Sequence, residues 1–218
     1  MSTSSRPVYL KQLELGPMQN FIYLLGDPTT RQAAVIDPGW EIPTVLKTAQ
    51  EDDYRLTHVF LTHTHFDHVM GLGALLHAVD VPVYLHREEA PGLTLASSSI
   101  KTVGDGEVVS VGTLPVTLIH TPGHTPGSQC LLVDDHLLSG DTLFIRGCGR
   151  CDLPGGDPAA LHHSLVQKLK KLDDHTQLYP GHNYAEVPVS TMAQERQSNP
   201  FLRLETLQEF LQVVGGIG

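Results

Sequence analysis

Leu61-Thr62-His63-Thr64-His65-Phe66-Asp67-His68 is the most informative segment of this chain. It follows the apolar residues 59–61 and precedes a helical pattern, so we expect it on a loop that leaves the end of a strand. Three imidazoles and one carboxylate occur within residues 63–68. Protonated imidazoles so close together would repel one another, whereas neutral rings can share a metal ion. The segment therefore predicts a metal site.

One loop cannot complete a site for two metal ions, and three later positions offer further ligands. Each is a histidine or aspartate that directly follows a glycine, and each comes shortly after an apolar run: His124, Asp141 and His182. A glycine lets the backbone approach a site closely. The shared placement predicts that these three side chains join the first segment at one end of the molecule.

Strand and helix patterns alternate along the chain. Runs rich in β-branched and aromatic residues predict strands at residues 21–25, 33–36, 58–61, 81–85, 116–119 and 129–133. Apolar residues at three- and four-residue spacings predict helices at 44–50, 68–78 and 159–172, the last with Asp157 as N-cap. The mixture indicates an α/β or α+β layered domain. Because no linker or repeat divides the chain, we expect one domain over residues 1–218, with residues 1–6 disordered.

The composition narrows the classes of function. The formal net charge of −10 over 218 residues disfavours nucleic acid as a partner. No apolar run approaches the roughly twenty residues needed to cross a bilayer, so no membrane partner is expected. Three cysteines predict no disulfide framework and a reducing compartment, and no apolar signal segment opens the chain, so we expect a cytoplasmic protein. Thirteen histidines against fourteen Lys and Arg residues are consistent with a metal site.

The ordered pattern of His63-x-His65-x-Asp67-His68, His124, Asp141 and His182 resembles the metallo-β-lactamase superfamily, over about residues 20–200. The resemblance implies a four-layer αββα sandwich with the metal ions at one edge, between two sheets. It also implies a set of ligands. The first metal ion would be held by His63, His65 and His124, the second by Asp67, His68 and His182, and Asp141 would bridge both.

An aspartate at position 141 narrows the subfamily that the resemblance suggests. The β-lactamases of this superfamily lack that aspartate, and the oxygen-reducing diiron members carry glutamate where this chain has His65. Nuclease members add domains or basic surfaces that a single acidic domain does not offer. The groups that still resemble the chain are glyoxalase II-type thioester hydrolases, persulfide dioxygenases and, more distantly, lactonases.

Local segments resemble both leading groups. Residues 145–150, Ile-Arg-Gly-Cys-Gly-Arg, are closer to the dioxygenases. Other segments look more like short bacterial glyoxalase II-type proteins: residues 36–39, 153–157, 195–196 and 199–202. We therefore expect first a hydrolase of small thioesters, similar to glyoxalase II and acting on hydroxyacylglutathione-type substrates through a metal-bound hydroxide. Asp67 and Asp141 would be its catalytic carboxylates.

The alternative is a mononuclear iron persulfide dioxygenase that acts on glutathione persulfide, and a weaker alternative is a lactonase. The hydrolase would use two divalent metal ions, zinc first, with iron or manganese also compatible with imidazole and carboxylate ligands. The dioxygenase would use a single Fe(II) held by His63 or His65, His124 and Asp141. A metal-binding protein without turnover is a weaker reading, because the full ligand set is present.

Three residues near the ligands are candidates for substrate binding. Arg146 and Arg150 are either surface arginines or groups that grip a substrate carboxylate. Tyr184 is either a packing residue or a hydrogen-bond donor to substrate. The expected partner is a small-molecule thioester or a glutathione-linked substrate. The oligomeric state stays open, with a homodimer as one option.

Overall fold

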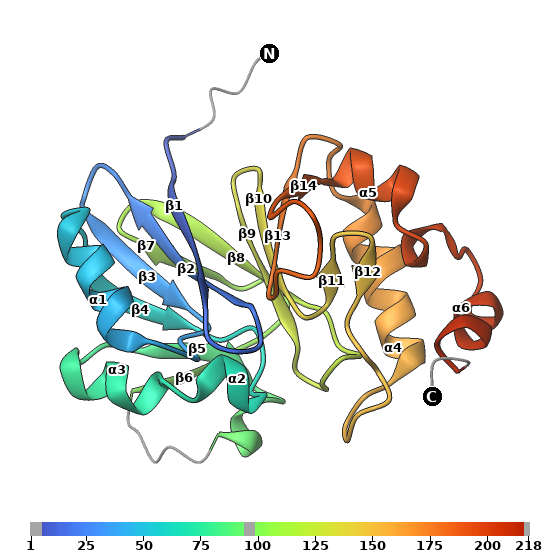
Figure 1. Ribbon diagram of the computed structural model, residues 1–218, viewed down its shortest axis with the longest axis horizontal. Coiled ribbons are helices and arrows are strands. Elements are labelled where there is room, and N and C mark those ends of the chain that lie inside the picture. Colours follow the sequence, from blue (N-terminus) through green and yellow to red (C-terminus); the bar gives the residue numbers. More distant parts are fainter. Residues whose placement is uncertain (1–5, 94–98, 216–218) are drawn as a thin grey trace.

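Within residues 6–93 and 99–215, which a computed structural model describes, two six-stranded β-sheets form the centre of the fold (Figure 1). The first sheet contains, in spatial order, β1 (Tyr9–Leu15), β2 (Asn20–Asp27), β3 (Gln32–Ile36), β4 (Arg55–Phe60), β5 (Val83–His86) and β6 (Ile100–Val103). The second contains β14 (Ser190–Thr191), β13 (Gln177–Pro180), β10 (His136–Gly140), β9 (Gln129–Val133), β8 (Leu114–His120) and β7 (Val108–Val111). A short hairpin pairs β11 (Leu143–Phe144) with β12 (Gly147–Cys148).

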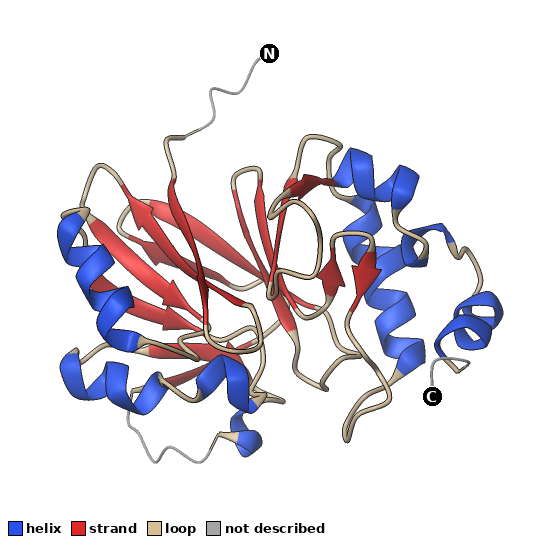
Figure 2. Ribbon diagram, viewed as in Figure 1, coloured by secondary structure: helices blue, strands red, loops and turns tan. Residues whose placement is uncertain are grey.

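Helices cover the outer face of each sheet (Figure 2). The first sheet packs against α1 (Ile42–Glu51) and α3 (Leu72–Ala78), and the short α2 (Phe66–Val69) lies beside them. The second sheet packs against α4 (Pro158–His163) and α5 (Met192–Ser198), and α6 (Leu207–Val214) packs against α4 on the side away from the sheet. A third apolar cluster fills the space between the sheets. The order of layers is helix, sheet, sheet, helix, which confirms the predicted αββα sandwich.

Strand β2 shows how the sequence specifies these layers. Phe21, Tyr23 and Leu25 point into the space between the sheets. Ile22 and Leu24 point to the other face, where they pack against the cluster that contains α1 and α3. Alternate side chains of a strand leave opposite faces, and both faces of this strand are buried. The continuous apolar run at residues 21–25 therefore belongs to a strand covered on both sides.

Two predicted helices differ in detail from the observed ones. The helix predicted at residues 68–78 is divided into α2 and α3 at Met70 and Gly71, where glycine lowers helix propensity. The helix predicted at 159–172 begins as expected, because Asp157 accepts hydrogen bonds from the backbone of Ala159 (2.8 Å) and Ala160 (3.1 Å). It then continues as a π-helical turn, Ser164–Lys168, and a 3-10 turn, Leu169–Lys171.

Other expectations concern the ends of the chain, the cysteines and membranes. The disorder predicted for residues 1–6 lies outside the described residues except at Arg6, whose guanidinium donates to the carbonyl oxygen of Thr113 (3.3 Å). The sequence predicts no disulfide framework, and Cys130, Cys148 and Cys151 are free thiols. Among the described residues, no helix has the length and apolar character that a membrane span requires.

Candidate metal centre

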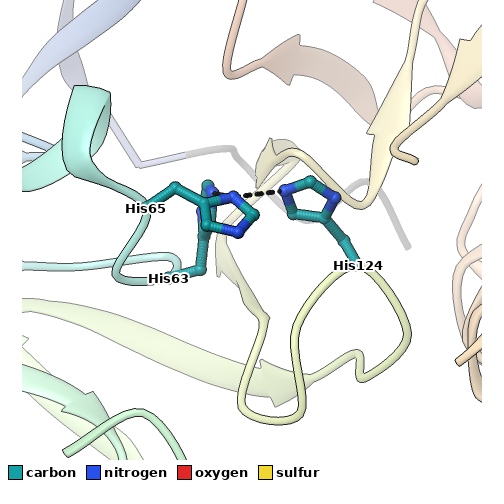
Figure 3. Close-up of side chains that lie close together, drawn as sticks. All are labelled: His63, His65 and His124. Atoms are coloured by element: carbon teal, nitrogen blue, oxygen red, sulfur yellow. Dashed lines mark hydrogen bonds between the residues drawn. The ribbon is translucent and has the colours of Figure 1, made fainter. Parts of the chain in front are cut away.

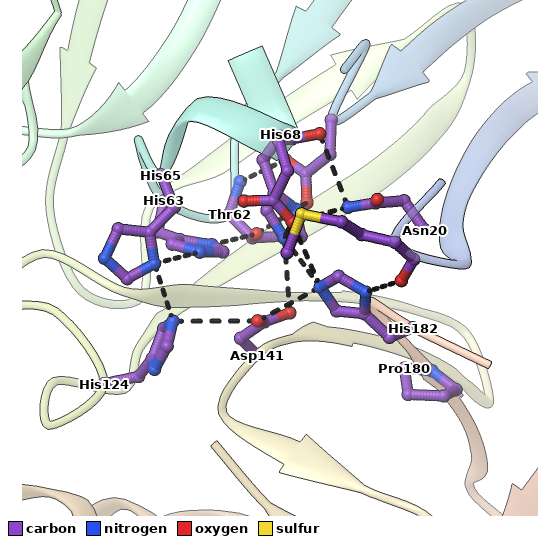
Figure 4. A network of polar contacts seen from close by, with 12 residues as sticks. Asn20, Thr62, His63, His65, His68, His124, Asp141, Pro180 and His182 are labelled. Carbon is purple, nitrogen blue, oxygen red and sulfur yellow. Dashed lines mark hydrogen bonds and ion pairs between the residues drawn. The ribbon is translucent and has the colours of Figure 1, made fainter. Parts of the chain in front are cut away.

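The candidate ligands come from loops of both sheets and meet at one edge of the sandwich (Figure 4). His63 and His65 lie on the loop after β4, and Asp67 and His68 follow on α2. The second sheet contributes the other three, each just beyond the end of a strand: His124 after β8, Asp141 after β10 and His182 after β13. All seven predicted ligand positions thus lie at the same end of the fold.

His63, His65 and His124 form the first cluster (Figure 3). Nδ1 of His65 lies 3.1 Å from Nε2 of His63 and 2.9 Å from Nε2 of His124. One atom from each ring lies within 4.8 Å of the others. His63 and His124 are buried, with exposed fractions of 1% and 4%, so water cannot satisfy these nitrogens freely. The three rings are arranged as ligands of one cation would be.

Contacts behind two of these rings fix where their lone pairs point. The hydroxyl of Thr62 donates to Asp37 (2.6 Å) and so accepts a hydrogen bond from Nδ1 of His63 (3.0 Å). Nδ1 of His124 donates to the carbonyl oxygen of Arg150 (2.7 Å). A neutral imidazole that carries its proton on Nδ1 has a lone pair on Nε2. Both Nε2 lone pairs are therefore directed into the centre of the first cluster, as metal ligation requires.

Asp67, His68 and His182 form the second cluster, also built entirely from buried residues. Nε2 of His68 and Nε2 of His182 are 3.2 Å apart, and each lies 3.4 Å from Oδ2 of Asp67. Their Nδ1 atoms face acceptors, namely Asp37 Oδ2 (3.0 Å) for His68 and the carbonyl oxygen of Met18 (2.9 Å) for His182. When both rings are neutral, their Nε2 atoms therefore carry lone pairs. These two lone pairs and the carboxylate of Asp67 would then face one another with no hydrogen atom between them.

Asp141 lies between the two clusters. Its Oδ2 is 3.6 Å from Nε2 of His124 in the first cluster and 3.3 Å from Nε2 of His182 in the second. Its Oδ1 is buried and accepts no hydrogen bond from the described residues, although Nε2 of His68 lies 3.4 Å away. A buried carboxylate oxygen without a donor costs free energy unless a cation pairs with it. This orphaned oxygen and the converging lone pairs fit divalent metal ions.

The pKa values of the candidate ligands bear on whether they can bind a cation. Burial lowers the pKa of His63 well below its ordinary value, so this ring is neutral and ready to bind a cation. Burial would also lower the pKa of His182, but hydrogen bonds to Asp141 and Asp67 raise it to about 9. Burial would lower the pKa of His68 as well. The nearby carboxylates of Asp141 and Asp37 nevertheless hold the pKa of this ring well above its usual range. A cation at the second cluster must therefore displace protons.

The glycine before His182 permits the close approach of two loops. A Cβ atom on Gly181 would lie 2.3 Å from Oδ1 of Asp141, and the backbone amide of Gly181 donates to the carbonyl oxygen of Gly140 (2.8 Å). Any larger side chain would occupy the space next to the orphaned oxygen. The sequence argument that each distant ligand follows a glycine thus has a steric basis at this position.

Several residues that hold the ligands in place were not predicted as site residues. Asp37 accepts hydrogen bonds from the backbone and hydroxyl of Thr62 and also faces an imidazole of the second cluster. The amide of Asn20 donates to Asp67 (2.8 Å). Glu89 is buried beside the loop that carries His63. In the sequence, these three residues have one feature in common, which is that each is a polar residue near an apolar run. Many surface residues have the same feature, so it does not identify a site residue.

A known protein family matches the part of the chain that carries the two clusters. The family model described as Metallo-beta-lactamase superfamily matches residues 15–182, which include every candidate ligand. The chain belongs to the metallo-β-lactamase superfamily. This assignment confirms the predicted family and agrees with the observed layers. Members of the superfamily are mostly metal-dependent enzymes, hydrolases or dioxygenases, and the two clusters give this member the residues for metal binding.

Relatives within the superfamily include both kinds of enzyme. The chain is 34% identical to the human mitochondrial persulfide dioxygenase ETHE1 in an alignment that covers 98% of this chain and 83% of that protein. It is 31% identical to BaeB of Bacillus velezensis, a probable polyketide biosynthesis zinc-dependent hydrolase, over 88% of this chain and 85% of BaeB. The crystal structure of ETHE1 from Myxococcus xanthus superposes with a TM-score of 0.88 at 36% identity, covering 96% of this chain and 91% of that one.

The three candidate substrate residues of this superfamily member differ in their surroundings. Tyr184 stacks on the ring of His182, with centroids 4.7 Å apart, and is 58% exposed. Arg146 is exposed, and its backbone amide donates to Glu195 (2.8 Å). Arg150 is also exposed, and its guanidinium forms two hydrogen bonds with Asp152. A role of these three residues in substrate binding stays a prediction.

Arg150 provides a test that separates substrate binding from metal binding. Arg150→Ala is expected to raise KM about tenfold or more for a glutathione-bearing substrate, because a hydrogen bond between charged groups contributes roughly 1.5–3 kcal/mol. Only the backbone oxygen of Arg150 contacts a candidate ligand, so the metal content should not change. Steady-state kinetics and elemental analysis measure the two effects. An equal loss for a small neutral substrate would assign Arg150 to the structure of the loop.

Proposed function

We propose that this chain is a persulfide dioxygenase that oxidises glutathione persulfide with O₂ and uses Fe(II). The observation that carries the proposal is the similarity to persulfide dioxygenases along nearly the whole chain, 98% for the human protein and 96% for the Myxococcus xanthus structure. The sequence alone favours a thioester hydrolase, with the persulfide dioxygenase as the alternative. This similarity supports the dioxygenase better than the hydrolase. The segment Ile-Arg-Gly-Cys-Gly-Arg at residues 145–150 points the same way.

The residues of the first cluster suit this chemistry. His63 and His124 direct lone pairs into one space, and Asp141 adds a carboxylate 3.6 Å from Nε2 of His124. Two histidines and one carboxylate with open positions are typical of non-haem Fe(II) oxygenases. When bound there, Fe(II) would supply the activation of O₂. The protein's own part is to fix these three side chains from behind and to keep water from the buried rings.

A thioester hydrolase with two metal ions remains the second candidate. The observation that favours it is the second cluster, in which Asp67, His68 and His182 lie as close together as ligands of another cation would. The similarity to BaeB, whose description is zinc-dependent, supports the same reading. Zinc, iron and manganese are all compatible with these imidazole and carboxylate donors.

The two candidates differ in the metal and co-substrate that they require. The test loads one preparation of the metal-free protein with Fe(II) under anaerobic conditions and another with Zn(II), and measures metal content by elemental analysis. Each is then assayed for O₂ uptake with glutathione persulfide and for cleavage of a glutathione thioester. We expect O₂ uptake by the iron form alone. One O₂ is consumed per persulfide, the S–S bond breaks to release glutathione and two protons, and the terminal sulfur becomes sulfite with two oxygens from O₂ and one from water.

Two variants make this test specific to the site. His63→Ala should abolish O₂ uptake, whereas His77→Ala, an exposed histidine on α3, should retain it. Rapid thioester cleavage by the zinc form, without O₂ uptake by the iron form, would reject the dioxygenase in favour of the hydrolase.

A further inference from the structure

Glu89 is a buried carboxylate outside the set of candidate ligands. It lies between β5 and the 3-10 turn Ala90–Gly92, and only 4% of its surface is exposed. No ion pair joins it to a basic side chain in the described part of the chain, residues 6–93 and 99–215. Burial of an unpaired charge is costly, so hydrogen bonds must stabilise this carboxylate.

Four donors surround the two oxygens of Glu89. Oε2 accepts from the backbone amide (2.8 Å) and the hydroxyl (2.6 Å) of Thr64. Oε1 accepts from the backbone amide of Gly127 (2.9 Å) and from the hydroxyl of Thr125. Each oxygen thus takes one amide and one hydroxyl hydrogen, and each oxygen is bound to a different loop.

Those two loops carry the whole first cluster. Thr64 lies between His63 and His65 in the sequence, and Thr125 directly follows His124. The carboxylate of Glu89 therefore connects the loop of the first sheet to the loop of the second at the point where their imidazoles come within 2.9 Å of each other. A metal site requires that its ligands lie within about 0.5 Å of the positions that the metal ion prefers. Hydrogen bonds to the residues behind the ligands provide this precision.

We propose that Glu89 is a positioning residue for metal binding, which sets the spacing between His124 and the pair His63 and His65 by holding their two loops together. Its carboxylate contacts amides and hydroxyls of the two loops and not the ligating nitrogens. The inference holds for either reaction considered above, because it concerns the affinity of the first cluster for its cation. Its test therefore does not depend on which activity the protein has.

Glu89→Gln is the sharpest substitution, since it keeps the size of the side chain. Glutamine has one oxygen and one NH₂ group, so its NH₂ group would face either Thr64 or Gly127. The backbone N–H of that residue is fixed in place and would lose its acceptor. Thr64→Val is a milder second variant that removes a single hydroxyl donor. Glu88→Gln makes the same change of charge at the adjacent exposed residue and should leave metal affinity unchanged.

Asp27 supplies a control for general loss of stability. It is a buried carboxylate that also accepts hydrogen bonds from two amides and two threonine hydroxyls, those of Thr29, Thr30 and Thr113. It connects the turn after β2 to the turn before β8, and neither turn carries a candidate ligand. Asp27→Asn should therefore lower Tm as Glu89→Gln does, but without a change in metal affinity.

The experiment titrates each full-length variant with Co(II) and Zn(II) in competition with a chromophoric chelator, and records the d–d absorption of the Co(II) form. We expect Glu89→Gln to weaken metal binding by about tenfold to a hundredfold and to alter the Co(II) spectrum. Thr64→Val should show a smaller change in the same direction. Parental affinity and spectrum in Glu89→Gln, or an equal loss of affinity in Asp27→Asn, would overturn the proposal.

Discussion

Asp141→Asn is expected to lower metal affinity at the first cluster by more than about a hundredfold and to abolish turnover, with the same loss at the second cluster if the protein holds two ions. Asparagine keeps the shape of the side chain but removes the negative charge. That charge lies between Nε2 of His124 and Nε2 of His182, at 3.6 and 3.3 Å. Without it, the buried oxygen that now accepts no hydrogen bond from the described residues could no longer offset the charge of a cation.

Metal titration followed by elemental analysis measures this effect, because it counts the ions that each variant retains. Asp80→Asn makes the same chemical change at an exposed position between α3 and β5, and it should bind metal like the parent. Loss at both clusters would show that Asp141 bridges two ions, as in the two-metal hydrolase, whereas loss at the first cluster alone would show that it does not bridge. A single site built on His63, His124 and Asp141 would then be favoured.

Gly149→Ala should damage the centre without changing a single ligand. A Cβ atom at this position would lie 1.8 Å from the backbone oxygen of Asp141 and 3.2 Å from Cγ of His124. The first distance is far below any van der Waals contact, so the backbone around Asp141 must move. We expect a loss of about 1–3 kcal/mol in the free energy of unfolding and about a hundredfold loss of activity from displaced ligands.

Gly73→Ala is the matched control for this substitution. Nothing lies within 4 Å of the Cβ that it would add on α3, and alanine favours a helix over glycine by up to about 1 kcal/mol. Chemical denaturation should therefore show Gly73→Ala to be as stable as the parent or more so. A Gly149→Ala protein with parental stability and metal content would mean that the loop at residues 147–150 adapts without moving Asp141.

The seven candidate ligands could be found from the sequence because their spacing is unusual. Three imidazoles and a carboxylate within six residues are hard to explain as surface polarity, and the later ligands share a strand end and a preceding glycine. Glu89 and Asp37 could not be found in this way. Glu88 and Glu89 are adjacent and chemically identical, yet one is exposed and the other bridges two loops. Only the folded chain brings Thr64 and Thr125 together around one of them.

Four of the strands that the sequence patterns missed have a common physical character. The predicted runs correspond to interior strands of the two sheets: β2, β3, β4, β5, β8 and β9. The edge strands β1, β6, β7 and β14 were not predicted, and the interior strands β10 and β13 were recognised only as apolar runs ahead of Asp141 and His182. An edge strand is partly exposed and carries polar residues, as the pattern of exposure along β1 and β7 shows. It therefore lacks the continuous apolar run that marks a strand buried on both faces.

The division of the ligands between two sheets has a consequence for how the protein acquires its metal during synthesis. A nascent chain that ends before residue 124 already contains His63, His65, Asp67 and His68, but none of the ligands from the second sheet. An ion captured at that stage has an incomplete coordination sphere and exchanges readily. Tight binding must wait until the second half has been made and packed, so most of the binding free energy stabilises only the finished sandwich. We therefore expect that a metal ion retained by the folded protein comes from the pool that surrounds the released chain.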